Sequence, residues 1–269
     1  MSISTTAVKK TALTVLKDKY LKSIIASAIY IFSCLVCLFC LELIGTVAGT
    51  ITEFVCFLIF SVFLIIPITL GLAFWGVRMV FCSDGHPLLI FNYFTDRDKY
   101  LRAIKFAVPF TAKSCFAGAI LFLPAFVVKL FASGKIFSML KMQIPIWVSG
   151  LSYVSGILEF FAFICLISVM LKYYLTPFLL AADEKMEPSE AMNISRIIAS
   201  ESKRDFVWLI LSLGLYIIAC IFMVPIIFIL PYFTVCFAVH CRFAVAAYNK
   251  NADRINSLNI PSFRADISF

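Results

Sequence analysis

Glu159 is the residue whose type and position point most directly to chemistry in this chain. It lies near the middle of a long apolar run, within the segment GILEF. A carboxylate at the centre of a bilayer costs about 3 kcal/mol on insertion scales, so it must be paired, protonated or facing water. A proton or substrate site would satisfy this requirement, and so would a structural hydrogen bond between helices. We therefore take Glu159 as a candidate intramembrane polar site.

Lys113 is a second ionisable residue inside an apolar run, and it joins Glu159 in the candidate polar site. It lies about two helical turns from the start of its run. A lysine at that depth can extend its ammonium group to the membrane interface, which is the simpler explanation of its position.

Cysteine and histidine spacings raise the question of a metal site. Cys34, Cys37 and Cys40 follow one another at three-residue intervals, and Cys236 precedes His240 by four residues. The three cysteines lie in an apolar run without polar partners, and two ligands do not make a site. Small buried hydrophobic residues are the better interpretation. Because phosphate-binding glycine loops and hydrolase motifs are also missing, we predict no catalytic residues, no metal and no cofactor.

The composition places these residues in a membrane protein. Hydrophobic residues make up 62% of the 269-residue chain and charged residues only 14%, against about 25% in soluble domains. A chain of this length cannot hide so much apolar surface from water, so lipid must cover it. The net charge of +8 is explained by basic cytoplasmic loops, and no nucleic-acid-binding module is visible.

Apolar runs predict an all-α, polytopic bundle of six transmembrane helices with cytoplasmic amphipathic helices at the interface. The chain divides into a basic amphipathic segment (1–22), a membrane domain (23–248) and a polar tail (249–269). The expected spans are roughly Ser23–Val47, Phe54–Val80, Phe106–Phe131 and Ile144–Tyr173, followed by two between Phe206 and Tyr248. Those last 43 residues suffice for two helices of about 20 residues, with the break between Pro225 and Pro231.

Basic residues determine the expected orientation. Nineteen Lys and Arg fall on the side of the two termini and three on the opposite side, with Lys113 inside a span. Because basic loops stay in the cytoplasm, both termini are predicted to be cytoplasmic, in the cell membrane. The basic segment Thr6–Lys22 is either a helix lying on anionic lipid or simply an orientation signal.

The longest polar interruption, Tyr173–Asp205, contains a predicted helix. Pro188 suits the first turn of a helix, and Glu190 adds negative charge near its amino end. Ile194 and Ile198 fall on one apolar stripe, so we predict a docking helix that lies parallel to the membrane with these two side chains inward. A solvated linker is the alternative.

Several short motifs resemble a group of bacterial integral membrane proteins of unknown function. This group is similar to the membrane domain of glycerophosphoryl diester phosphodiesterases. The resemblance covers about Ser61 to Lys250 and implies a membrane helical fold. Because no phosphodiesterase catalytic domain is present, it implies no such activity and transfers no functional residues. The motifs are Pro67-Ile68-Thr69-Leu70-Gly71-Leu72, Tyr174-Leu175-Thr176-Pro177, Glu190-Ala191 with Ser195, Phe206, and Pro231-Tyr232.

Three hypotheses of function follow. The first is a non-enzymatic membrane protein that supports or regulates another membrane component, with the lipid bilayer and another membrane protein as partners. The second is a transporter or exporter of small solutes or lipids, with Glu159, Pro67 and Pro225 around its path. The third is a lipid-modifying enzyme, which would need a convergent polar cluster that the sequence does not show.

Overall fold

The computed structural model describes residues 4–17, 19–82, 85–133, 148–219 and 223–252, and these are almost entirely helical, with no strand among them. The predicted all-α class is confirmed. Residues 134–143 of the predicted external loop (132–143), the first four residues of the predicted fourth span (144–147) and residues 253–269 of the polar tail lie outside the described residues.

The chain forms two compact units. The first unit combines residues 1–108 with 173–269, and the second unit comprises residues 109–172. Each unit has its own packing. The long helix α6 (Arg97–Ala132) contributes its first turns to the first unit and the remainder to the second.

In the first unit, a helical hairpin leads into a chain of shorter elements. Gly49 turns α2 into α3 with a φ of 85°, a conformation that residues with a Cβ atom avoid. The elements in order are α1 (Thr5–Leu16), α2 (Tyr20–Ala48), α3 (Thr50–Phe60), the π-helical η1 (Ser61–Ile65), α4 (Ile66–Phe81), the 3₁₀ helix η2 (Pro87–Phe91), α5 (Asn92–Thr95), α9 (Thr176–Ala182), α10 (Pro188–Ser212), α11 (Gly214–Ala219) and α12 (Met223–Ala252).

Helix α4 forms the centre of this unit. This helix packs against α9, η2 and α12, and its Trp75 is fully buried. Two glycines permit the closest approaches. A Cβ atom on Gly71 would lie 1.7 Å from the carbonyl oxygen of Ile90, and one on Gly76 would lie 2.8 Å from Thr234 Cγ2. The chain therefore needs glycine at these positions to seat η2 and α12 on α4.

Five described segments are long and apolar enough to cross a membrane, namely Tyr20–Ala48, Ile51–Phe81, Arg97–Ala132, Gly150–Ala182 and Pro225–Asn249. The membrane class of the protein is thereby supported. The predicted fifth span, starting at Phe206, is not among these segments. In the described residues, the helix of this segment is interrupted at Leu213, where α10 ends, and it resumes in α11.

The predicted break between Pro225 and Pro231 is wrong. Helix α12 runs without interruption from Met223 to Ala252, with Pro231 inside it. Pro225 occupies the first turn, where a missing N–H removes no helical hydrogen bond.

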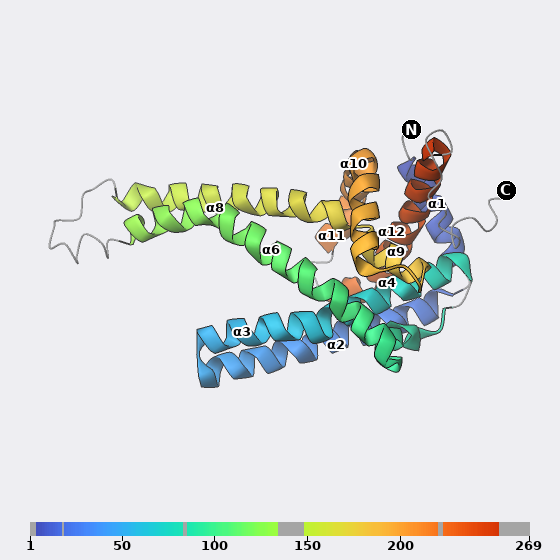
Figure 1. Ribbon diagram of the computed structural model, residues 1–269, viewed down its shortest axis with the longest axis horizontal. Helices are drawn as coiled ribbons and strands as arrows, with labels where there is room; N and C mark the ends of the chain where they lie inside the picture. Colours follow the sequence, from blue (N-terminus) through green and yellow to red (C-terminus); the bar gives the residue numbers. More distant parts are fainter. Residues whose placement is uncertain (1–3, 18, 83–84, 134–147, 220–222, 253–269) are drawn as a thin grey trace. The chain divides into compact units, whose positions relative to one another are not determined.

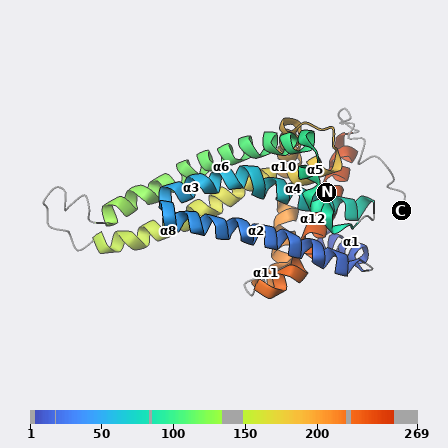
Figure 2. The ribbon, with the colours of Figure 1, turned by 90° about the horizontal axis from the view of Figure 1, so that it is seen from below.

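Helix α12 lies across the end of α2 and α4 rather than alongside them. Tyr20, the first residue of α2, donates a hydrogen bond to the carbonyl of Phe228 at 2.8 Å. The guanidinium of Arg242 lies 5.2 Å from the ring of Phe81, the last residue of α4. Because α2 begins where α4 ends, both contacts lie at one end of the unit, and α12 crosses it. Figures 1 and 2 both show α10 and α12 running across the direction of α2 and α3.

Helix α1 packs its apolar stripe against α12. Val8, Ala12 and Leu16 are buried there, spaced by four residues on one face. Protein and not lipid therefore covers Val8 and Leu16, two of the apolar residues of this basic segment. Its exposed face carries Lys10, Leu13 and Lys17.

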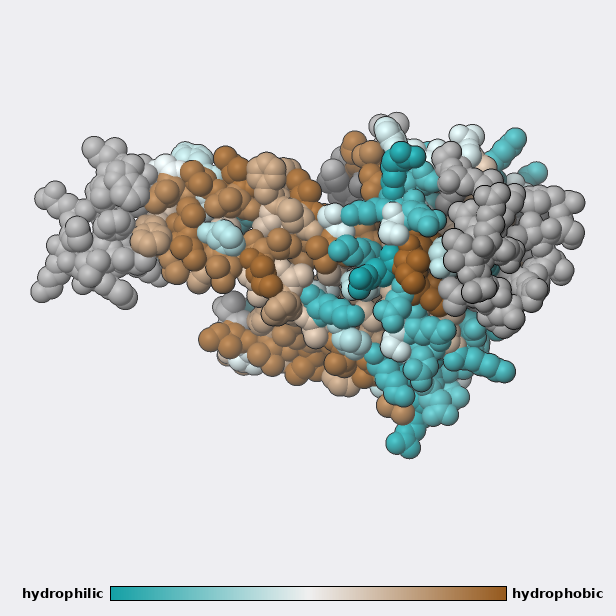
Figure 3. All heavy atoms as spheres, turned by 45° about the horizontal axis from the view of Figure 1, so that its top comes forward, coloured by the Kyte–Doolittle hydropathy of each residue, from teal (hydrophilic) through white to brown (hydrophobic). Residues whose placement is uncertain are grey.

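The second unit is a hairpin of the later part of α6 and α8 (Val148–Met170). Ser114 donates a hydrogen bond to Met170 Sδ at 3.0 Å, and Lys129 pairs with Glu159, so the two helices are antiparallel. Their outer surface is apolar, as the brown side chains over α6 and α8 in Figure 3 show. In the first unit, brown residues cover α2 and α3, and the hydrophilic residues gather at the opposite end of that unit.

Candidate functional site

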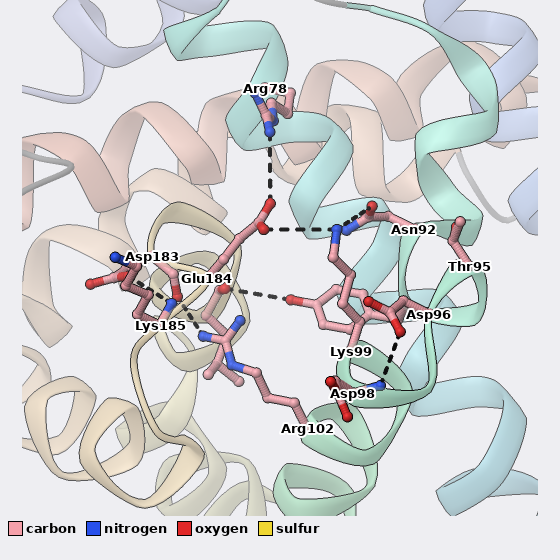
Figure 4. Close-up of polar contacts among 12 residues, drawn as sticks. Arg78, Asn92, Thr95, Asp96, Asp98, Lys99, Arg102, Asp183, Glu184 and Lys185 are labelled. Carbon is pink, nitrogen blue, oxygen red and sulfur yellow. Dashed lines mark hydrogen bonds and ion pairs between the residues drawn. The ribbon is translucent and has the colours of Figure 1, made fainter.

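Polar and charged side chains from four parts of the first unit meet in what we call the polar cluster: Arg78 of α4, Asn92 of α5, Lys99 and Arg102 of α6, and Glu184 in the turn between α9 and α10 (Figure 4). Glu184 lies between two cations. Its carboxylate is 3.7 Å from Arg78 Nη2 and 3.7 Å from Lys99 Nζ. Lys99 also donates a hydrogen bond to Asn92 Oδ1 at 3.3 Å.

These ion pairs are half-exposed, so water screens them and each contributes little to stability. Their consequence is mainly geometric. Glu184 holds α4 and α6 at a common point, and the cluster remains open to water and to ligands.

Arg102 holds the α9–α10 turn in place. Its Nε donates to the carbonyl of Met186 at 3.0 Å, and its Nη2 donates to the same carbonyl at 2.8 Å and to the carbonyl of Asp183. Asp183 in turn accepts the backbone N–H of Lys185 at 2.8 Å. Because a guanidinium presents several donors in a fixed plane, one side chain satisfies two turn carbonyls.

Tyr93 supports the cluster from beneath. Its ring meets Phe74 edge-on, and its hydroxyl lies 3.5 Å from the carbonyl of Leu180. Burial raises the pKa of Tyr93 to about 12, and the positive charge of Arg102 opposes part of that shift. Tyr93 is therefore a neutral packing residue at physiological pH.

Three hollows surround the cluster, and Glu184 borders all of them. The largest, about 380 Å³, is bordered by Lys105 of α6 and by Glu187 and Ser189 at the start of α10. The second is about 280 Å³ and the third about 250 Å³. Both signs of charge border the largest hollow, so it suits a ligand that carries both.

Helix α10 begins at Pro188, with Glu187 as its N-cap and Glu190 in its first turn, at the position that the sequence indicates. Ile194 and Ile198 are 4% and 2% exposed, respectively. They hold α10 on the first unit, so these two side chains are not available to a binding partner. The exposed face of the helix carries other residues.

A second polar group is buried deeper in the first unit, and the sequence analysis missed it. The hydroxyl of Tyr174 lies 2.8 Å from Ser202 Oγ and 3.1 Å from His240 Nε2. Phe206 stacks on the Tyr174 ring, with centroids 3.9 Å apart. No signal in the sequence joins a residue of the turn before α9 with residues of α10 and α12. Because Tyr174 and His240 satisfy each other in a tightly packed site, this group reads as an internal hydrogen-bond network.

Glu159 pairs with Lys129 at 3.0 Å in the second unit. Lys129 and Lys113 are 16 residues apart on α6, or roughly 24 Å along a helix, so Glu159 and Lys113 do not form one site. The pairing that a carboxylate within an apolar run requires is therefore provided by Lys129.

Within the described residues, no group of three or more Cys, His, Asp and Glu side chains is arranged to hold a metal ion. The chain matches no protein-family model, no curated protein and no solved structure. The resemblance to the phosphodiesterase membrane domain therefore stays an expectation.

Proposed function

We propose that this chain is a non-enzymatic integral membrane protein that supports or regulates another membrane component, and that the polar cluster binds a water-exposed segment of that component. The observation that carries the proposal is the largest hollow, where cations and anions line a turn held by Arg102. Lys105 and Glu187 present opposite charges there, so a polypeptide segment of mixed charge is the expected ligand.

The orientation follows from charge. The polar cluster lies in two of the segments that carry the 19 basic residues assigned to one side, so we place it and both termini in the cytoplasm. A partner would therefore present a cytoplasmic loop or tail. Arg102 keeps the binding surface rigid, which reduces the entropy lost on association.

Photo-crosslinking in native membranes tests this proposal. A benzoylphenylalanine at Leu101 or Ser189, which both border the hollow, should give one discrete adduct of higher mass. The same group at Ser200, on the exposed face of α10, is the matched control. The adducts should disappear when Lys105→Glu reverses a charge in the hollow. Equal adducts at all three positions, or none at Leu101 and Ser189, would refute the assigned surface.

The transporter and the lipid-modifying enzyme receive less support. Neither Glu159, Pro67 nor Pro225 borders any of the three hollows, and Glu159 is committed to Lys129. The geometry gives most support to a protein that supports or regulates another membrane component.

A further inference from the structure

We infer that α10, α11 and α12 form a layer in the lipid interface, held there by an apolar face at the junction of α10 and α11, and that only α2, α3–α4, α6 and α8 cross the bilayer. The interface face comprises Trp208, Leu211, Tyr216 and Ile218. The ligand of this face is the headgroup and upper acyl region of the bilayer.

The first argument is the cover of α12. Its central residues are buried all around by α1, α2, α4 and α10, including Val235, Cys236, Val239 and Val245. A helix that is surrounded by protein and a helix that is surrounded by lipid are both apolar on every side, because neither contacts water. The apolar composition of α12 alone therefore does not place it in lipid. Its crossing of the end of α2 and α4 sets it near the plane of the membrane.

The second argument is the exposed face itself. Trp208 is 60% exposed and Leu211 61%, on a helix whose opposite side is buried. Tyr216 and Ile218 of α11 are exposed as well. Tryptophan and tyrosine favour the boundary between headgroups and acyl chains, because each has an apolar ring and a polar hydrogen-bonding group. Figure 2 shows α11 at the edge of the first unit, beyond α2.

The third argument is that hydrogen bonds connect this layer to the start of a membrane span and to the lysines of α1. The Tyr20–Phe228 hydrogen bond joins α12 to the start of α2, where exposed Leu21 and Ile25 begin the apolar surface of a span. Lys9 of α1 donates a hydrogen bond to the carbonyl of Ser212 at 2.7 Å, beside Leu211. The lysines of α1 are thus brought to the interface face, where anionic headgroups would lie.

Tryptophan fluorescence measures the depth of this face. The chain has three tryptophans, so the difference between Trp147→Phe and the double variant Trp147→Phe, Trp208→Phe isolates Trp208. The protein is placed in vesicles of phosphatidylcholine and phosphatidylglycerol that are brominated either near the headgroup or near the chain end. We expect the loss of Trp208 fluorescence to be larger with bromine near the headgroup, and iodide in the water to cause little loss.

Two further variants calibrate the depth. In the double-variant background, Phe39→Trp on the exposed surface of α2 reports the membrane interior, and Arg196→Trp on the exposed face of α10 reports water. If Trp208 were quenched like the tryptophan at position 39, the α10–α11 segment would cross the bilayer and the inference would be overturned. Quenching like that at position 196 would place the face in water and would also overturn it.

Discussion

At the scale of single residues, the chain places each unusual side chain beside a specific partner. Glu159 lies 3.0 Å from Lys129 on the neighbouring helix, although 39% of its side chain and 65% of that of Lys129 are exposed. In hydrocarbon an isolated charge is costly, so the pair lowers the cost of both groups. Gly71 and Gly76 are determined by packing and not by charge, since a Cβ atom at either position would collide with a neighbouring element.

We predict that Glu159→Lys reduces the amount of folded protein in the membrane, because it sets two ammonium groups together in an apolar hairpin. The cost should be about 3 kcal/mol. Glu159→Gln should be tolerated, since its amide oxygen can still accept a hydrogen bond from Lys129. The measurement is the monodisperse peak in detergent size-exclusion chromatography. Combining Glu159→Lys with Lys129→Glu should restore that peak, and normal levels of the single lysine variant would show that the position faces water.

Gly71→Ala should destabilise the first unit severely, because the added methyl group would lie 1.7 Å from the Ile90 carbonyl. The backbone of η2 would have to move, which costs about 3 kcal/mol or more. Gly118→Ala is the matched control in a helix, since a Cβ atom there meets nothing within 4 Å. Thermal unfolding in detergent should show a lower midpoint for position 71 alone. Equal midpoints for the two variants would contradict the close approach.

At the scale of elements, α10 and the turn before it behave as one positioned piece. The helix is attached by a buried stripe that includes Ile194 and Ile198, and its first turn is attached through the hydrogen bonds of Arg102. Most of the stability of a helix in a protein comes from the packing of its apolar face, so this tertiary contact stabilises α10.

The double variant Ile194→Asp, Ile198→Asp should release α10 from the first unit, because two carboxylates would replace buried apolar groups. Trypsin should then cut at Arg196 at least several times faster than in the wild type. The control is Asn193→Asp with Ser200→Asp, which adds the same charge on the exposed face. If the wild type and both variants are cut equally fast, α10 is not docked and the segment is a linker.

Arg102→Lys should loosen the α9–α10 turn without unfolding the unit. A lysine keeps the positive charge but cannot donate in a fixed plane to the carbonyls of Asp183 and Met186. Hydrogen–deuterium exchange of the peptide containing residues 183–187 should accelerate. Arg97→Lys, at the exposed start of α6, should leave that exchange unchanged. An unchanged rate in the Arg102 variant would show that the turn holds itself.

At the scale of the whole molecule, the question is which side of the membrane each polar segment occupies. Five candidate spans would place the termini on opposite sides, whereas four spans, with α12 in the interface, would place them together. With both termini on one side, the basic residues divide 19 against three, and this asymmetry favours that arrangement.

In a background without native cysteines, single cysteines at Thr95 and Ser189 should react with a membrane-impermeant maleimide only after the cytoplasmic side is opened. A cysteine at Ser133 should react from outside in intact cells, because it follows α6 on the opposite side. A cysteine at Ser4 should behave like those at Thr95 and Ser189. Labelling of Ser189 from outside would overturn the topology.

The sequence by itself determined the membrane class, the all-α fold and the start of α10 at Pro188. Those depend on composition and on neighbouring residues, which act locally. It placed the break between the fifth and sixth spans wrongly, because hydropathy measures how apolar a segment is and not where a helix ends. Lipid cover and protein cover favour the same apolar residues, so hydropathy alone does not distinguish a helix buried by protein from a membrane span.

Only the tertiary structure decided where the polar side chains meet. Arg102 and Met186 are 84 positions apart, and Lys129 and Glu159 are 30 apart, so no local pattern pairs them. The crossing of α12 over α2 and α4 depends on close approaches at Gly76 and Phe81 that involve distant helices. Such contacts form because the sum of packing and hydrogen bonding favours one arrangement of the helices, which is a property of the folded chain as a whole.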